Sequence, residues 1–388
     1  SLLKMAVDVG KNISSFLSSK QSSCSSELAA EWAALDELHT KKLYHQLTLK
    51  LMTFVKHPSL QEGDQLIELY SKFITYIENK INPLSLVEIL AFVVQQYTDW
   101  KEAVSFLEKM EVKVKGCEDA VMLCKVFEGQ ILLEKLSDTL ATKKIIDDVE
   151  KELDKKDGVG PVHGRFYLLA STYYRQQGKH AEYYRTALRY LGCVNLDDLT
   201  FKEQMQHAFF LGLAALLGEG VYNLGELLAH PVLQTMKNTP NKWLVDLLLA
   251  FNSGDIAKFD EMKPKWSSVP DLAAQELKLR QKISLLCLME MTFKRPSTDR
   301  QLTFEEIAAE TRLPVNEVEL LVMKALAQGL VKGAIDQVDG RVHMTWVQPR
   351  VLDKQQIGTM VKRLDVWCKD VKNMEQLLET QAHDFLTL

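Results

Sequence analysis

The chain has 388 residues, a net charge of −5 and 46% hydrophobic residues. Its length allows one to three domains with a large core. The charge is spread along the chain, which argues against a nucleic-acid-binding tail or a polybasic membrane anchor. The longest apolar run, about Ala208 to Leu217, is shorter than the roughly 20 residues of a membrane-spanning helix. The first residues show no secretory signal pattern.

Six cysteines are scattered along the chain without a C-x-x-C pair, and most of them lie in apolar helical runs. This pattern is typical of buried free thiols in a reducing compartment, and it argues against disulfides or a zinc site. The cysteines are Cys24, Cys117, Cys124, Cys193, Cys287 and Cys368.

The beginning of the chain differs in composition from the rest. Residues 14–26 (SSFLSSKQSSCSS) are rich in serine, so we predict a mobile segment over residues 1–30. From Glu27 onward, apolar residues recur every three or four positions, as in Leu35, Leu38 and Leu43. This spacing predicts amphipathic helices and therefore a mainly α fold.

Turn signals divide the helical part into similar lengths. They lie at Asp99, Ser137, Gly178, Gly218 and Gly254, and each interval holds two helical stretches. A period of about 40 residues built from helix pairs is typical of an α-solenoid of helical hairpins. A non-repeating helical bundle with the same turn spacing is the alternative. Linkers over residues 153–164 and 294–301 predict further breaks between helices.

A helix-turn-helix pattern follows the second linker. Thr303 and Glu306 form a capping box for a helix over residues 304–311. Pro314 begins a second helix, and Gly329 ends it. The apolar face of this second helix consists of Val318, Leu321, Val322 and Ala325.

Two strands complete a winged-helix module over residues 302–350. The strands are expected over residues 331–335 and 341–347, with Asp339-Gly340 as a two-residue hairpin turn. Val342, Met344 and Trp346 alternate with Arg341, His343 and Thr345, as a half-buried strand requires.

The charge of the second helix argues against nucleic-acid binding. In such a motif this helix enters the major groove, where a basic face is needed. Here Glu317 and Glu319 stand against Lys324, and the preceding helix adds three more glutamates. The wing contributes only Lys332 and Arg341. We therefore expect the module to contact protein, with a nucleic-acid binder kept as an alternative.

The last segment predicts one long helix with an apolar stripe, capped by Asp353 and Gln356. Apolar residues recur at intervals of seven, and Met360, Trp367 and Met374 fill the position three residues further on. This is the pattern of a coiled-coil seam, so we predict packing against helices of other chains. The alternative is a stripe that folds back onto its own domain. The seven-residue row consists of Ile357, Leu364, Val371, Leu378 and Phe385.

No catalytic constellation stands out. The nine histidines form neither an H-x-H nor an H-E-x-x-H zinc motif. The glycine-rich stretch from Gly218 to Glu226 lacks the last glycine of a dinucleotide fingerprint and the Lys-Ser/Thr of a P-loop. We therefore expect no enzyme activity, no cofactor and no metal.

Five segments resemble PCI-domain subunits of the lid of the proteasome's 19S regulatory particle. The resemblance covers nearly the whole chain from about Trp32 onward. The segments are LYHQLTLKL (residues 43–51), NPLSLVEIL (82–90), FFLGLAALLGEGVYNLGELLAHPVL (209–233), LLCLMEMTF (285–293) and LTFEEIAAETRLPVNEVELLVMKALAQGLVKGAIDQVDGRVHMTWVQPRVL (302–352).

The resemblance implies a division into parts. An N-terminal helical-repeat domain would cover residues 31–181, and a PCI domain residues 182–350. The PCI domain would consist of helical repeats to about residue 294 and the winged helix over 302–350. Residues 351–388 would form a helix that joins a bundle with C-terminal helices of other subunits.

The resemblance also implies function, partners and location. The chain would be a non-catalytic structural subunit acting in ATP- and ubiquitin-dependent protein degradation, in cytoplasm and nucleus. Its partners would be other PCI-domain lid subunits and metalloprotease-like lid subunits, with no nucleic acid and no membrane. The alternative assemblies are the COP9 signalosome and a translation initiation complex.

Two sets of residues are the candidates for partner contact. One is the C-terminal helix, through Ile357, Leu364, Trp367, Val371, Leu378 and Phe385. The other is the wing strand over residues 341–347, through Arg341, His343 and Thr345, which we expect to be an exposed sheet edge with unpaired backbone groups.

Overall fold

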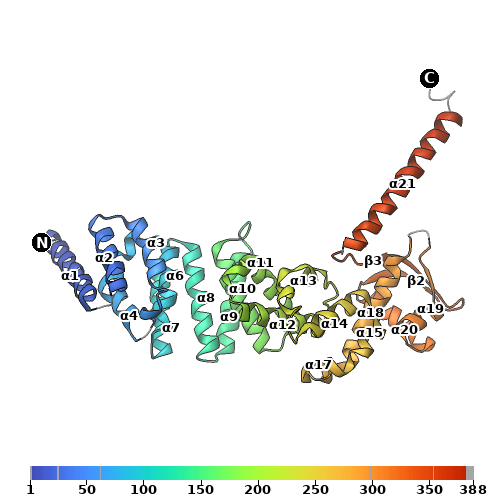
Figure 1. Ribbon diagram of the computed structural model, residues 1–388, viewed down its shortest axis with the longest axis horizontal. Coiled ribbons are helices and arrows are strands. Elements are labelled where there is room, and N and C mark those ends of the chain that lie inside the picture. The colour runs from blue at the N-terminus through green and yellow to red at the C-terminus, as the bar shows by residue number, and fades with distance from the viewer. Residues whose placement is uncertain (1, 24–25, 62, 297–298, 353, 382–388) are drawn as a thin grey trace. The chain divides into compact units, whose positions relative to one another are not determined.

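The computed structural model describes residues 2–23, 26–61, 63–296, 299–352 and 354–381 (Figure 1). The chain divides into two units. The first runs to Gly178 and includes Arg189–Val194, and the second comprises Lys179–Leu188 and the residues from Asn195 onward. The predicted mainly helical fold, with helical hairpins, a small sheet and a long C-terminal helix, is confirmed.

The first unit is built from successive antiparallel helices. Its α-helices are α1 (Leu2–Ser23), α2 (Ser26–Thr40), α3 (Tyr44–Phe54), α4 (Gln65–Leu69), α5 (Thr75–Ile77), α6 (Pro83–Val94), α7 (Trp100–Lys113), α8 (Glu118–Glu134), α9 (Thr139–Leu153) and α10 (Pro161–Gln176). Shorter turns of helix are η1 (Pro58–Leu60), η2 (Tyr70–Ile74) and η3 (Glu78–Lys80). Helix α11 (His180–Cys193) contributes residues to both units.

The serine-rich start forms helix α1, which differs from the predicted mobile segment. Ile13, Phe16 and Leu17 are buried in it, at a spacing of three and four residues that places them on one helical face. The Phe16 ring meets the Trp32 ring edge to face, with 6.1 Å between centroids. Serine hydroxyls such as that of Ser15 bond to carbonyls one turn back. The serines therefore occupy a solvated helix surface, and the apolar face decides the fold.

The predicted helix breaks coincide with helix ends. Asp99 accepts a hydrogen bond from the Lys101 amide at the start of α7, and Asp138 accepts one from the Ala141 amide at the start of α9. Such caps satisfy amides that have no partner within the helix. Gly254 ends a helix at φ +67°, where a side chain would collide with the backbone of Cys287.

The second unit begins with further helices and ends with the winged helix. Its helical elements are η4 (Leu196–Asp198), α12 (Phe201–Leu217), α13 (Gly225–Ala229), η5 (Pro231–Met236), α14 (Lys242–Ser253), α15 (Ile256–Glu261), α16 (Lys263–Trp266), α17 (Pro270–Ala274), α18 (Glu276–Lys294), α19 (Phe304–Thr311), α20 (Val315–Ala327) and α21 (Lys354–Gln381). The strands are β1 (Gln301–Thr303), β2 (Val331–Asp336) and β3 (Arg341–Val347).

The winged helix has the predicted helices but a larger sheet than expected. The capping box of Thr303 and Glu306 is present. An additional strand, β1, pairs antiparallel with β3, so the strand order is β1-β3-β2. The predicted two-residue hairpin turn is wrong, because β2 ends at Asp336 and β3 begins at Arg341. The Asp336 carboxylate accepts hydrogen bonds from the amides of Val338 and Asp339 in the connecting loop. The turn therefore begins at Asp336, before the predicted Asp339-Gly340.

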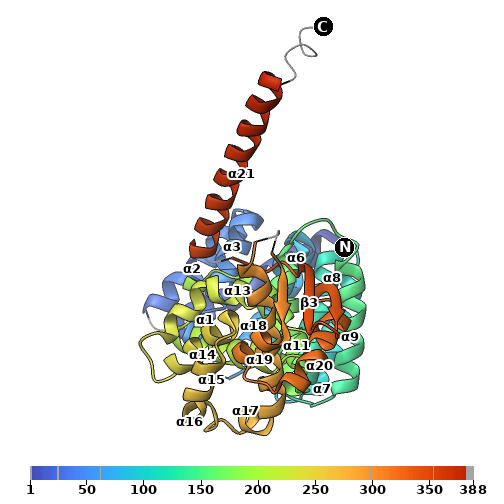
Figure 2. The ribbon, with the colours of Figure 1, turned by 90° about the vertical axis from the view of Figure 1, so that its right-hand side faces the viewer.

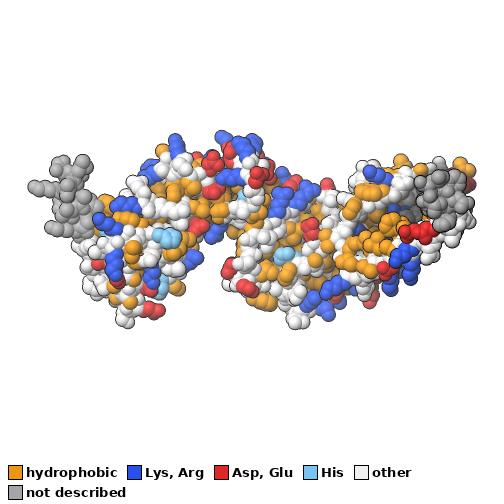
Figure 3. Space-filling view, turned by 90° about the horizontal axis from the view of Figure 1, so that it is seen from above, with side chains coloured by type: hydrophobic (Ala, Val, Ile, Leu, Met, Phe, Trp, Pro, Cys, Tyr) orange, Lys and Arg blue, Asp and Glu red, His pale blue; other side chains and the backbone are white. Residues whose placement is uncertain are grey.

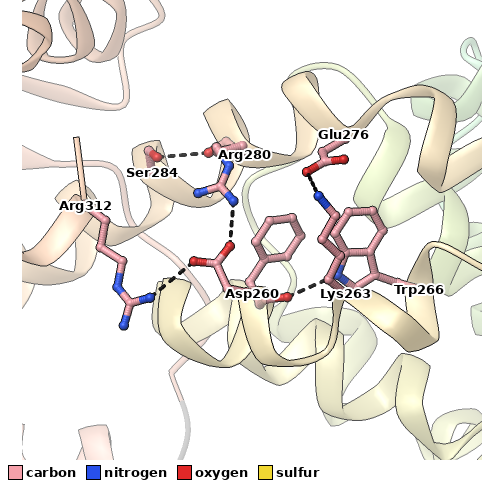
Figure 4. A network of polar contacts seen from close by, with 8 residues as sticks. Asp260, Lys263, Trp266, Glu276, Arg280, Ser284 and Arg312 are labelled. Carbon is pink, nitrogen blue, oxygen red and sulfur yellow. Dashed lines mark hydrogen bonds and ion pairs between the residues drawn. The ribbon is translucent and has the colours of Figure 1, made fainter. Parts of the chain in front are cut away.

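An acidic residue joins the helical part of this unit to the helix-turn-helix (Figure 4). Asp260 on α15 lies 2.6 Å from the Arg280 guanidinium on α18 and 3.3 Å from that of Arg312. Arg312 ends α19 with a left-handed φ of 53°, which is uncommon for a residue other than glycine. One carboxylate thus contacts two elements that lead into the winged helix.

A buried lysine closes the C-terminal end of α12. Lys282 on α18 is 7% exposed, and its Nζ donates to the carbonyls of Ala215, Leu216 and Gly218 at 2.6, 3.1 and 2.9 Å. Burial lowers the pKa of Lys282 to about 7. The three carbonyls replace the water that the ammonium loses, and they lie at the negative end of the helix dipole.

We predict that Lys282→Met lowers the free energy of unfolding of the full chain by roughly 1–3 kcal/mol, because it leaves buried carbonyls without a donor. Urea unfolding followed by circular dichroism measures the change. Lys278→Met is the matched control, since Lys278 lies one turn away with its side chain 65% exposed. Equal stability of the two variants would show that the cap contributes nothing.

Three glutamates lie close together between α7 and α8. Burial raises the pKa of the half-buried Glu128 to about 7, and the negative charges of Glu108 and Glu111 add to the shift. Lys125 offsets part of the charge and lies 3.7 Å from Glu111. Because the folded pKa exceeds the ordinary value of 4.5, the folded state binds more protons than the unfolded state between these two values. Stability contributed by this group is therefore lost as pH rises through that window.

We predict that Glu128→Gln stabilises the chain at pH 8, by roughly 1–3 kcal/mol, and leaves it nearly unchanged at pH 4.5. Thermal melts at both pH values test this. Glu118→Gln serves as the control, because the Glu118 side chain is 84% exposed on the same helix. A gain that is equal at both pH values would exclude titration of Glu128 as the cause.

Candidate functional site

Helix α21 exposes its whole apolar stripe. It has 28 residues, a length of about 42 Å at 1.5 Å per residue, and none of these described residues is buried. Figure 2 shows it as one continuous helix, and Figure 3 shows hydrophobic side chains exposed at several places on the face of the molecule that it presents. The exposed fractions are 50% for Ile357, 55% for Leu364, 63% for Trp367, 50% for Val371 and 51% for Leu378.

The helix confirms the geometry that the seven-residue repeat predicts. Seven residues correspond to nearly two helical turns, so the repeated positions share one face. Met360 and Met374, which are 43% and 57% exposed, widen the stripe. Phe385 and Asp353, the predicted capping residue, lie outside the described residues. We refer below to Ile357, Met360, Leu364, Trp367, Val371, Met374 and Leu378 as the seam.

A buried ion pair holds the segment that leads into α21. Arg350 lies 2.6 Å from Glu290 on α18, and each side chain is 8% exposed. Arg350 also donates to the carbonyl of Asn252 at 3.2 Å. Val351 lies so close to Gly225 that any side chain there would collide with it. These contacts fix the point where α21 begins, and no motif in the sequence pointed to them.

The outward face of α20 carries apolar side chains that the sequence analysis missed. Leu320 and Met323 are 65% and 51% exposed, and their spacing of three residues places them side by side. Lys324, the basic residue of this helix, donates to Gln281 at 2.8 Å. Glu317 is exposed. An apolar and acidic face suits contact with protein better than contact with phosphate.

The wing residues lie on the middle strand of the sheet, which corrects the predicted free edge. Residues 341–343 pair with β1 on one side, and β3 pairs with β2 on the other. Backbone docking at this part of β3 is therefore excluded by its own sheet. The side chains of Arg341, His343 and Thr345 are exposed on one face, so they remain candidates through their side chains.

The described residues offer no metal site, and their buried thiols are unreactive. They contain no cluster of three or more His, Cys, Asp or Glu residues placed to hold a metal ion. The five described cysteines are free thiols, as predicted, and Cys24 lies outside the described residues. Burial raises the pKa of the Cys124 and Cys287 thiols to about 12, which makes both unreactive. Among the helices of the described parts, none has the length and apolarity to cross a membrane.

The fold defines the class of protein. Helical repeats that lead into a winged helix are the arrangement of a PCI-domain protein, and the family model for the PCI domain matches residues 259–346. A second model, described as PSD13 N-terminal repeats, matches residues 31–248. That match extends past residue 181, where the sequence predicts a domain boundary, and the boundary remains a prediction.

Relatives of nearly equal length specify the family. The chain is 39% identical over 369 residues to 26S proteasome non-ATPase regulatory subunit 13 homolog B of Arabidopsis thaliana, which covers 93% of this chain and 96% of the relative. It is 34% identical over 364 residues to 26S proteasome regulatory subunit RPN9 of Saccharomyces cerevisiae, with 89% and 91% covered. The chain belongs to the 26S proteasome non-ATPase regulatory subunit 13 family, as the resemblance indicated. This family consists of non-catalytic regulatory subunits, so the chain is assigned no enzyme activity.

Members of the alternative assemblies are more distant. COP9 signalosome complex subunit 7 of Dictyostelium discoideum is 27% identical over 154 residues, which is 39% of this chain and 56% of the relative. Eukaryotic translation initiation factor 3 subunit M of Coccidioides immitis is 22% identical over 224 residues, with 57% and 48% covered. Higher identity over nearly the full length favours the proteasome family over both alternatives.

Proposed function

We propose that this chain is a structural subunit of the proteasome's regulatory-particle lid. It acts in ATP- and ubiquitin-dependent protein degradation in cytoplasm and nucleus, and its role is to hold other subunits in place. The relatives, which are regulatory subunits of the 26S proteasome, support the assignment to this assembly. The surfaces of α21 and of the winged helix support the mode of contact.

The seam of α21 is the observation that carries this proposal. An isolated helix in water is only marginally stable, because most helix stability in proteins comes from packing of an apolar face. Here the described chain supplies no cover for the seam. Each large apolar side chain gains about 1.5–3 kcal/mol when it is fully buried. Packing against helices of other subunits would recover this energy for seven side chains at once.

The winged helix supplies a second contact in this proposal. Leu320 and Met323 on α20 form a small apolar surface that a partner can cover. Arg341, His343 and Thr345 offer polar side chains on the open face of the sheet. We assign the winged-helix contact to other PCI-domain subunits. We assign the seam to a bundle that includes the C-terminal helices of metalloprotease-like subunits.

We predict that Leu364→Asp reduces incorporation of the chain into the lid at least tenfold, because it places a charge in an apolar contact. Val366→Asp is the matched control, since Val366 is 58% exposed on the same helix and lies two residues, or about 200° around the helix, from Leu364. Native gel electrophoresis of cell extracts, with quantification of free and assembled chain, measures the effect. Equal losses for both variants would mean that the seam has no special role.

We further predict that a chain without residues 353–388 folds but does not assemble. None of the described residues of α21 is buried, so their removal should leave the core intact. The melting temperature should therefore stay within a few degrees of that of the full chain. Co-purification with tagged lid subunits tests assembly. Assembly at the normal level would refute the role of α21 and would move the main contact to the winged helix.

A further inference from the structure

A pocket of about 300 Å³ opens where α21 leaves the winged helix. Its walls come from α18, β3, the segment after β3 and the first turns of α21. The lining is mostly apolar and includes Phe293, Trp346, Val347, Leu352 and Met360. All of these residues belong to the second unit. A partner side chain that fills an apolar hollow of this kind removes the apolar lining from water, which is energetically favourable.

The pocket is continuous with the seam. Met360 belongs to both, and Gln356, which also lines the pocket, lies one turn before it on the same side of α21. At the base of the helix, Arg363 donates to the carbonyl of Lys294 at the end of α18. A helix that packs along the seam would therefore reach the pocket at its end. This continuity identifies the occupant as a helix rather than a small molecule.

One wall of the pocket carries a guanidinium with too few acceptors. Arg300 donates from Nη1 to the carbonyl of Thr345 at 3.3 Å. Its Nε is buried and has no hydrogen-bond partner, and Arg300 forms no ion pair with any described carboxylate. The other arginine in the pocket, Arg350, is balanced by Glu290. A buried donor without an acceptor costs roughly 1–3 kcal/mol, and a carboxylate from outside would pair with the positive charge of this guanidinium.

We propose that this pocket receives the end of the partner helix that packs along α21, and that this end carries a large apolar side chain beside an acidic one. The apolar side chain fills the pocket against Phe293 and Trp346. The carboxylate accepts from the Arg300 guanidinium. The inference rests on the proposed function, because it requires that the seam packs against a helix of another subunit.

Photo-crosslinking in the assembled particle tests the proposal. The photoreactive residue p-benzoylphenylalanine replaces Gln356 at the pocket, Leu364 on the seam, or Asn373 on the opposite face of α21 as a control. The first two are expected to capture the same partner subunit. Mass spectrometry should locate the Gln356 crosslink at a helix end with an acidic residue next to a large apolar one.

The outcomes separate the pocket from the seam. If position 364 captures a partner while position 356 captures only this chain or nothing, the pocket inference is overturned and the proposed function stays intact. Absence of partner capture at both positions would overturn both. Capture at Gln356 of a helix without an acidic residue would refute the role assigned to Arg300.

Arg300→Met provides an independent test of the ion pair. The variant removes the unpaired donor, so the free chain should melt at the same temperature as the wild type or higher. Its incorporation into the lid should fall about tenfold, the equivalent of ~1.4 kcal/mol. Arg295→Met is the control, because Arg295 pairs with Glu306 within the chain at 3.0 Å. Unchanged incorporation of Arg300→Met would contradict the proposal.

Discussion

The fold depends on one constraint: an amphipathic helix is stable in water only when another surface covers its apolar face. In the first unit each helix finds that surface on the next one, as Trp32 of α2 does between Phe16 of α1 and Phe54 of α3. In the second unit α18 is covered so fully that even Lys282 and Glu290 on it are buried. Helix α21 obeys the same constraint but has no cover among the described residues. This difference supports the proposed role of α21 in contact with other chains.

Buried polar groups fix the positions that packing alone leaves open. Apolar contacts are non-directional, so they do not define where one helix ends against another. Lys282 requires three carbonyls at the end of α12, and Arg350 requires both Glu290 and Asn252. Such pairs add little net stability, but breaking one leaves an uncompensated charge. They therefore specify the register of α12 on α18 and the origin of α21.

The sequence predicts the features that local rules decide. Capping residues, helix periodicity and the seam of α21 were all visible, because each depends on neighbours within a few positions. Strand β1 was missed because three residues carry no periodic signal and β3 selects them by pairing. Its presence makes β3 a middle strand, and the predicted free edge at Arg341 and His343 was wrong for that reason. Helix α1 was missed because serine content masked the spacing of Ile13, Phe16 and Leu17.

The buried polar contacts at the base of α21 could not be predicted from the sequence. Arg350 and Glu290 are 60 residues apart, and Arg300 donates to Thr345 on β3, 45 residues further along the chain. Such long-range pairs have no signature in a single sequence. They show, however, how a folded chain can expose a long apolar stripe without losing its fold. The stripe is carried by a helix whose origin is fixed by buried polar contacts, while the core of the second unit is complete without it. In the proposed assembly, folding and association are thereby separate steps: the chain folds first and then offers the seam, at a defined position, to helices of other subunits.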